Sequence, residues 1–171
     1  HDRGILSAIK HFPGHGSSRA DSHKGFVDIT DTWSPEELIP YDRIVKAGRC
    51  DMVMTAHVFN GKLDPEWPAT LSSETIHHIL REYMGYEGVI ISDDMQMGAI
   101  RDNYSIETAI KRAVCAGVDI LLFANNSIFE EDIASRAGAI LERLVSEGTL
   151  SADRIDASYR RIMKLKERLR R

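Results

Sequence analysis

The segment KHFPGHGSSRADSH, residues 10–23, places three histidines, an aspartate, a lysine and an arginine within fourteen positions. A proline and two glycines in the same segment disfavour a helix, so these side chains are expected on a loop. Three explanations suit such a segment. It could bind a metal, it could carry a proton-transfer site, or it could be a solvated loop that is rich in histidine by composition alone.

The metal hypothesis uses four side chains of this loop. His11, His15, Asp21 and His23 could supply three nitrogens and one oxygen, a ligand set that suits Zn²⁺. However, a proline and a glycine separate the first two histidines, so no helix can present them on one face. This spacing is weak evidence for a metal site, and we expect neither a metal nor another cofactor.

The proton-transfer hypothesis needs fewer residues. Asp21 and His23 are two positions apart, so an extended segment can place their side chains on the same side. A carboxylate beside an imidazole fixes its tautomer and makes it a competent acid and base near neutral pH. Asp93, directly after an apolar run, could be the opposing carboxylate, although it could also be an ordinary loop or N-cap residue. Lys10 and His11 could equally form a strand-end salt bridge and a buried histidine.

Short apolar runs and amphipathic stretches alternate along the whole chain. The runs are continuous, as expected for parallel strands that are covered by helices, and they span residues 4–9, 51–58, 88–94 and 117–124. Four βα units predict a parallel sheet with right-handed crossovers. They suffice for half of a (β/α)8 barrel, whereas the competing flavodoxin-like sheet normally has a fifth strand.

The helices between the strands have recognisable ends. Ser34 as N-cap and Glu37 as its partner predict a capping box for the first helix, and Pro40 predicts an irregular first turn. Glycines end the next helices at Gly85 and Gly117. Two further helices are expected over residues 127–148 and 151–171. We see no linker and treat residues 1–171 as a single domain.

Chemically useful residues follow each of the four strands. In both candidate folds ligands bind at the carboxyl ends of parallel strands, so these residues should share one rim. They are Lys10, His11, His57, Asp93, Asp94, Asn125 and Asn126. This coincidence predicts an active site there.

The composition of the chain argues against nucleic-acid binding and against a membrane-spanning segment. The 171 residues are 43% hydrophobic and 28% charged, as in a globular protein with a core, and a net charge of −4 gives no footprint for nucleic acid. No apolar run is long enough to cross a membrane. Cys50 and Cys115 predict buried thiols in a reducing compartment, and hence the cytoplasm. Because the chain starts with His1, we expect a fragment of a longer protein.

Three blocks resemble one enzyme family. The segments KHFPGHGSSRADSH, MTAHVFNGKLDPEWPATLS and GYEGVIISDDMQMGAI occur in the order found in the NagZ-type β-N-acetylhexosaminidases of glycoside hydrolase family 3. The likeness extends over essentially the whole chain. It implies a TIM-like (β/α)8 barrel, of which this chain would form the C-terminal half, strands five to eight.

The resemblance also implies roles for matching residues. Asp93 matches the catalytic nucleophile, His23 the general acid/base, and Asp21 the residue that orients His23. Lys10 and His11 match a pair that holds hydroxyls of the N-acetylglucosamine ring. In a further position, His57 matches a rim histidine that could also contact the substrate.

The implied reaction is retaining hydrolysis of a terminal β-linked N-acetylglucosamine through a covalent glycosyl-enzyme, in peptidoglycan turnover. The implied partners are the saccharide, with no nucleic acid and no membrane. Either a missing N-terminal half-barrel or a second copy should cover the open sheet edges. Two alternatives stay open: a β-glucosidase of the same broad family, and an inactive half-barrel that serves as an assembly unit.

Overall fold

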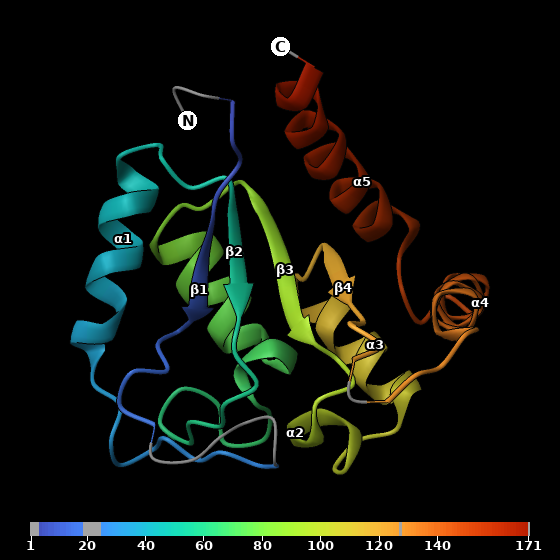
Figure 1. Cartoon of the computed structure of the whole chain (residues 1–171), viewed down its shortest axis with the longest axis horizontal. Helices are drawn as coiled ribbons and strands as arrows, with labels where there is room; N and C mark the ends of the chain where they lie inside the picture. The colour runs from blue at the N-terminus through green and yellow to red at the C-terminus, as the bar shows by residue number, and fades with distance from the viewer. Residues whose placement is uncertain (1–3, 19–24, 127, 171) are drawn as a thin grey trace.

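The predicted parallel α/β fold is confirmed. A computed structural model describes residues 4–18, 25–126 and 128–170, so the dyad predicted at Asp21 and His23 lies outside the described residues. The four strands are β1 (Ala8–Phe12), β2 (Met52–Thr55), β3 (Val89–Asp94) and β4 (Ile120–Leu122). All three pairings are parallel, in the order β1-β2-β3-β4 (Figure 1).

Helices follow each strand; the predicted ones are present, but the helix expected over residues 127–148 begins only at Ile133, and the short helices η2 and α2 were not predicted. They are η1 (Pro35–Leu38), α1 (Ile39–Lys46), η2 (Ala69–Leu71), the π-helix η3 (Glu74–Tyr83), α2 (Gly98–Arg101), α3 (Ile106–Ala116), α4 (Ile133–Ser146), α5 (Ala152–Glu167) and η4 (Arg168–Arg170). The strand arrows in Figure 1 all point to the end of the molecule opposite the two labelled termini. The loops at that end therefore form the rim on which the site was predicted.

The sheet has one covered face and one half-open face. Val53 and Ile90 are fully buried in the main core, which the helices complete. Their strand neighbours Met54 and Ile91 remain partly exposed. Because side chains alternate along a strand, the half-open face carries every second residue of β3.

A second, smaller core lies beyond the strand ends. It is formed by Val27, Ile29, Trp33, Ala56, Val58 and Ala69. The backbone of Phe59 joins both sides of this cluster, since its amide donates to the Val27 carbonyl and its carbonyl accepts from the Ile29 amide, each at 2.8 Å. The loops after β1 and β2 are thus packed together beyond the carboxyl ends of these strands.

The first helix begins differently from the prediction. The capping box is wrong: the Ser34 side chain caps no backbone amide, and the Glu37 carboxylate accepts from the Gly16 amide at 3.2 Å. The first turn is a 3₁₀ helix ahead of Pro40, as its position predicted. In contrast, α3 ends at Gly117 as predicted, and at its start Ser105 Oγ accepts from the Thr108 amide at 3.1 Å.

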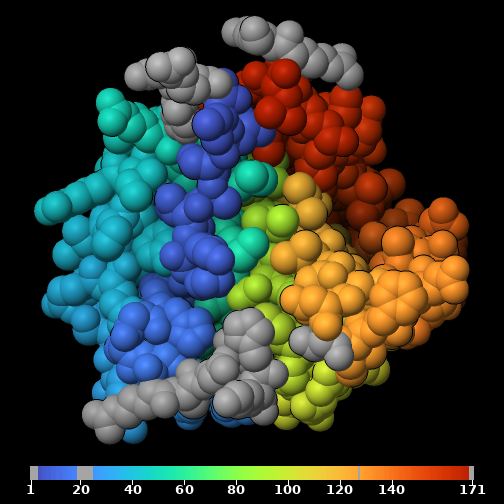
Figure 2. Space-filling model, in the orientation of Figure 1, coloured from blue at the N-terminus to red at the C-terminus, as the bar shows by residue number. Residues whose placement is uncertain are grey.

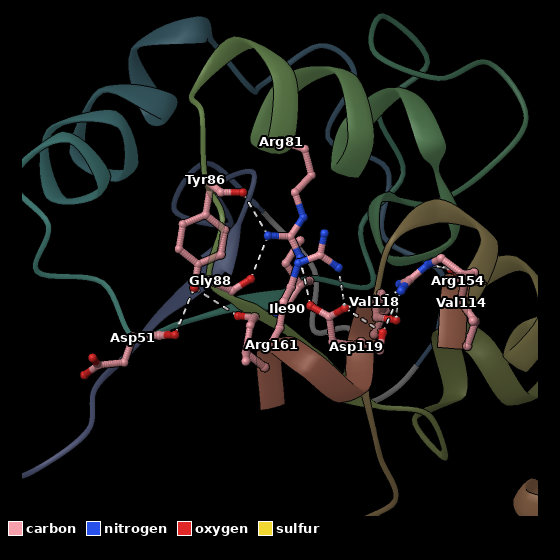
Figure 3. Close-up of polar contacts among 12 residues, drawn as sticks. Asp51, Arg81, Tyr86, Gly88, Ile90, Val114, Val118, Asp119, Arg154 and Arg161 are labelled. Atoms are coloured by element: carbon pink, nitrogen blue, oxygen red, sulfur yellow. Dashed lines mark hydrogen bonds and ion pairs between the residues drawn. The ribbon is translucent and has the colours of Figure 1, made fainter. Parts of the chain in front are cut away.

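A buried ion cluster fastens α5 to the amino-terminal end of the sheet (Figure 3). The Asp119 side chain is 0% exposed. Its carboxylate accepts from Ser158 Oγ at 2.6 Å, Arg81 Nη2 at 2.8 Å, the Ile90 amide at 3.0 Å, Arg161 Nη1 at 3.2 Å and Arg154 Nη1 at 3.4 Å. Burial lowers the pKa of Arg81 to about 10, partly opposed by the charge of Asp119, so this guanidinium stays protonated at neutral pH.

The cysteine prediction is wrong in one respect. Cys50 is half-buried, and burial raises the pKa of its thiol, but Cys115 is exposed on α3. In the described part of the chain, no helix combines the length and apolar character needed to cross a membrane.

Both outer strands have a free edge within the described residues. β1 pairs only with β2, and β4 pairs only with β3. Figure 2 shows the blue segment that contains β1 lying on the surface of the molecule over much of its length. Edges of this kind can pair with further strands.

Candidate active site

The carboxyl ends of β1 and β3 bring two predicted site residues together. His11 Nε2 lies 3.6 Å from Asp93 Oδ2, and the two side chains are 28% and 17% exposed. Lys10 precedes His11 on β1 and is exposed. The sequence prediction that these strand ends share one rim is correct for the histidine and the carboxylate.

Asp93 and Asp94 point to opposite faces of the sheet and differ in their contacts. Asp94 is 7% exposed, and its Oδ1 accepts from the amides of Gln96 at 3.0 Å and Ala124 at 3.1 Å. It therefore fixes the loops after β3 and β4. Asp93 Oδ1 accepts from the Asp94 amide at 2.9 Å, and the Asp93 carboxylate is partly open to solvent. A partly open carboxylate is the one that can meet a substrate.

Hydrogen bonds and a ring contact hold the first part of the loop after β1, up to residue 18. The Trp33 indole donates to the Pro13 carbonyl at 3.0 Å, and the Gly14 amide donates to the His11 carbonyl at 2.9 Å. The His15 ring meets the His11 ring edge-on, with centroids 6.2 Å apart. This part of the histidine-rich segment is consequently an anchored turn that orients His11.

Gly14 is required for this turn. It has φ of +124°, and a Cβ there would lie 2.5 Å from Glu37 Oε2 and 2.7 Å from Glu37 Cβ. We expect Gly14→Ala to lower stability by about 1–3 kcal/mol through backbone strain and to displace the turn beside His11. Urea unfolding checks the stability, and a rate assay with the full-length protein checks the displacement.

Gly138→Ala is the matched control for Gly14. It lies within α4, where an added Cβ would meet no atom within 4 Å and φ is not positive, so alanine should stabilise by about 0.5–1 kcal/mol. Equal unfolding midpoints for the two variants would show that the Gly14 turn bears no strain.

His57 does not line the rim as a substrate-contacting residue. It is 1% exposed, and both ring nitrogens lie within hydrogen-bond distance of protein atoms, with Nδ1 2.8 Å from Thr70 Oγ1 and Nε2 3.0 Å from the Asp94 carbonyl oxygen. The prediction that His57 contacts the sugar is therefore wrong. The histidine follows an apolar strand, which is why the sequence could not separate a buried position from a rim position.

Asn125 also belongs to the scaffold of the rim. It has φ of +54°, its amide donates to Gln96 Oε1 at 2.9 Å, and its side chain donates to the Glu130 carbonyl at 3.0 Å. These contacts hold the loop after β4 against the loop after β3.

A groove lies beside the site. It has a volume of about 660 Å³ and is lined by Ala8, Ile9, Lys10, His11, Gly14, His15, Gly16, Glu37, Pro40, Tyr41 and Ile44. This groove follows the outer edge of β1 and does not include Asp93. Asp93 lies on the half-open face, so this groove and the Asp93 carboxylate are separate features of the rim.

The metal hypothesis gains no support from the described residues near the rim. Within the described ranges, the group with suitable metal ligands close together is His77, His78 and Glu82, whose donor atoms lie within 4.8 Å of one another. All three are exposed on η3, and no rim histidine belongs to the group. The set of four predicted in the loop includes Asp21 and His23, which lie outside the described residues.

The structure adds rim contacts that the sequence did not predict. Four side chains form hydrogen bonds with residues of the rim or its loops, namely those of Glu37, Trp33, Gln96 and Thr70. Glu37 and Trp33 lie more than fifteen positions from their partners, so no local spacing could have revealed them.

This geometry places a partly exposed carboxylate at the carboxyl end of a parallel strand, where α/β folds bind their ligands. The family model "Glycosyl hydrolase family 3 N terminal domain" matches residues 1–165. Similar proteins include a beta-hexosaminidase A of Pseudoalteromonas piscicida, 34% identical over 97% of this chain and 30% of its own length. A beta-hexosaminidase of Xylella fastidiosa is 36% identical over 94% of this chain and 50% of its own length.

Solved structures show the same relationship. The glycoside hydrolase family 3 beta-N-acetylglucosaminidase from a Paenibacillus species superposes with a TM-score of 0.89 and 36% identity, covering 99% of this chain and 32% of that one. The chain therefore belongs to glycoside hydrolase family 3. It spans between about a third and a half of the length of the two beta-hexosaminidases.

Proposed function

We propose that the full-length protein carrying this chain is a β-N-acetylhexosaminidase that removes terminal β-linked N-acetylglucosamine with retention of configuration. The observation that carries the proposal is the half-open Asp93 carboxylate at the end of β3, 3.6 Å from His11. The names of the family relatives, beta-hexosaminidase and beta-N-acetylglucosaminidase, support the choice of an amino sugar.

In the proposed reaction Asp93 is the nucleophile. One of its carboxylate oxygens attacks the anomeric carbon, the bond from that carbon to the leaving oxygen breaks, and His23 gives its proton to the leaving oxygen. Water then attacks the same carbon, His23 takes a proton from the water, and the ester bond to Asp93 breaks. Two inversions give net retention. Asp21 keeps the imidazole of His23 in the tautomer needed for both steps.

Lys10 and His11 are proposed to hold the sugar. His11 Nε2 is within ion-pair distance of Asp93 Oδ2, so its ring lies where it can donate to a hydroxyl of a sugar bound at that carboxylate. Lys10 adds a positive charge on an exposed side chain. Both side chains can donate hydrogen bonds to the hydroxyls of a bound sugar.

The open edges of β1 and β4 support a larger assembly. We propose that a preceding half-barrel in the full-length protein pairs with both edges, and that a second copy is the alternative occupant. Cell-wall fragments with terminal N-acetylglucosamine are the proposed natural substrates, in the cytoplasm.

A glycosidase assay separates this proposal from its two alternatives. The full-length protein and residues 1–171 are each offered aryl β-N-acetylglucosaminide and aryl β-glucoside. We expect turnover of the amino sugar by the full-length protein and little or none by residues 1–171. Preference for the glucoside would favour a β-glucosidase. No turnover of either sugar by the full-length protein would favour an assembly unit without catalysis.

A further inference from the structure

His57 is buried at the carboxyl end of the sheet and connects three elements of the fold. It follows β2, its Nδ1 lies 2.8 Å from Thr70 of η2, and its Nε2 lies 3.0 Å from the main-chain oxygen of Asp94 at the end of β3. The ring is 1% exposed. The buried ring therefore connects η2 and the end of β3 to the segment that follows β2.

The partners of the ring determine where its proton must be. A carbonyl oxygen can only accept a hydrogen bond, so Nε2 must carry a proton to bond the Asp94 oxygen. Thr70 Oγ1 can donate or accept, and its hydroxyl hydrogen has two acceptors within reach, namely His57 Nδ1 at 2.8 Å and the Ala56 carbonyl at 2.9 Å. The Thr55 hydroxyl, 2.8 Å from Thr70 Oγ1, can donate to it in either case.

This arrangement permits either charge state of the ring while keeping Nε2 protonated. Burial lowers the pKa of His57, although the nearby carboxylates of Asp93 and Asp94 oppose the shift. Besides these two groups on β3, His11 on β1 has its Nε2 3.6 Å from Asp93 Oδ2. In the neutral ring, Nδ1 accepts from Thr70 and Nε2 still donates to Asp94.

We infer that His57 is a positioning residue that fixes the main chain at the end of β3 through the Nε2–H bond to Asp94, and so sets the place of the Asp93 carboxylate. The anchored carbonyl belongs to the peptide unit that follows Asp94, and the Asp94 Cα joins this unit to the one between the two aspartates. The amide of that second unit donates to Asp93 Oδ1 at 2.9 Å. Displacing the Asp94 main chain therefore moves the Asp93 carboxylate through this amide.

The inference rests on the proposed function, because it concerns the nucleophile of that reaction. Small displacements of a reacting group are costly: about 1 Å can lower a rate on the order of 10²-fold. A residue that controls this displacement should affect the turnover number far more than substrate binding.

Two amide variants of His57 can each keep a different one of its two hydrogen bonds. In the full-length protein, His57→Gln places an amide nitrogen near the position of Nε2 and can keep the bond to Asp94. His57→Asn is shorter, so its amide reaches only toward Thr70. We expect kcat with aryl β-N-acetylglucosaminide to fall on the order of 10²-fold for His57→Asn and much less for His57→Gln, with KM within about twofold in both.

Equal losses of kcat in the two amide variants would overturn the inference, because a buried ring that serves stability alone does not distinguish them. A loss that falls mainly on KM would also overturn it and would make His57 a substrate-binding residue after all. Melting temperatures measured beside the kinetics separate lost fold from lost position.

A second measurement does not depend on activity. Nitrogen-15 spectra of the full-length protein labelled at histidine should show His57 with a proton on Nε2 at neutral pH. A ring protonated on Nδ1 alone would overturn the inference. If the wild-type protein hydrolyses no N-acetylglucosaminide but His57 shows the Nε2–H tautomer, the proposed function fails while the positioning network stands.

Discussion

Replacing Asp93 by Asn should abolish hydrolysis by the full-length protein, lowering kcat by about 10³-fold or more. The amide is nearly the same size as the carboxylate but cannot form the glycosyl ester. Because Asp93 is 17% exposed and its Oδ1 accepts a neighbouring main-chain amide that an Asn oxygen can also accept, the variant should keep the fold. The measurement is the initial rate with aryl β-N-acetylglucosaminide, alongside the melting temperature.

Asp94→Asn is the matched control, since it makes the same change one residue along. The amides of Gln96 and Ala124 both donate to Asp94 Oδ1, and an Asn oxygen can accept the same two amides. We expect this variant to keep kcat within about tenfold of the wild type. A reversed result, with Asp94→Asn inactive and Asp93→Asn active, would show that the nucleophile has been assigned to the wrong aspartate.

Replacing Asp119 by Ala should have the largest effect on stability. The carboxylate is fully buried and is contacted by three guanidinium groups, from Arg81, Arg154 and Arg161 (Figure 3). Removing it leaves these cations without their counter-ion, and breaking a buried ion pair by deleting one partner costs about 3–5 kcal/mol. The free energy of unfolding in urea measures the loss.

Asp156→Ala tests whether any loss of a negative charge from this region has the same effect. Asp156 lies on α5, as do two of the three arginines, but it is exposed. Surface substitutions of this kind usually change stability by less than about 0.5 kcal/mol. If the two alanine variants unfold at the same urea concentration, the Asp119 cluster does not fasten α5 to the sheet.

Sequence periodicity was sufficient to predict the sheet because the signal is local. The runs that became β2 and β3 are continuous and apolar, as strands covered by helices require. The start of α1 was predicted less well. Glu37 has the spacing of a capping residue, but its carboxylate binds the Gly16 amide, which belongs to a loop more than twenty residues earlier. No local pattern encodes such a contact.

The candidate site likewise contains residues that sequence rules placed correctly and residues that they could not place. The rule that ligands meet the carboxyl ends of parallel strands correctly placed His11 beside Asp93. It could not place His57, because whether a residue after a strand faces the rim or the interior depends on the loop that packs over it. Here Thr70, thirteen residues later, covers the ring. The roles of Asp21 and His23 stay predictions.

The covalent mechanism is tested most sharply by a search for the glycosyl ester itself. The full-length protein would be incubated with a fluorinated N-acetylglucosaminyl fluoride that forms the ester quickly and loses it slowly, and then digested for mass spectrometry. We expect the peptide containing Asp93 to gain the mass of one sugar, with the modification mapping to that carboxylate. A sugar attached to another residue, or full turnover with no attached sugar at all, would show that Asp93 is not the nucleophile.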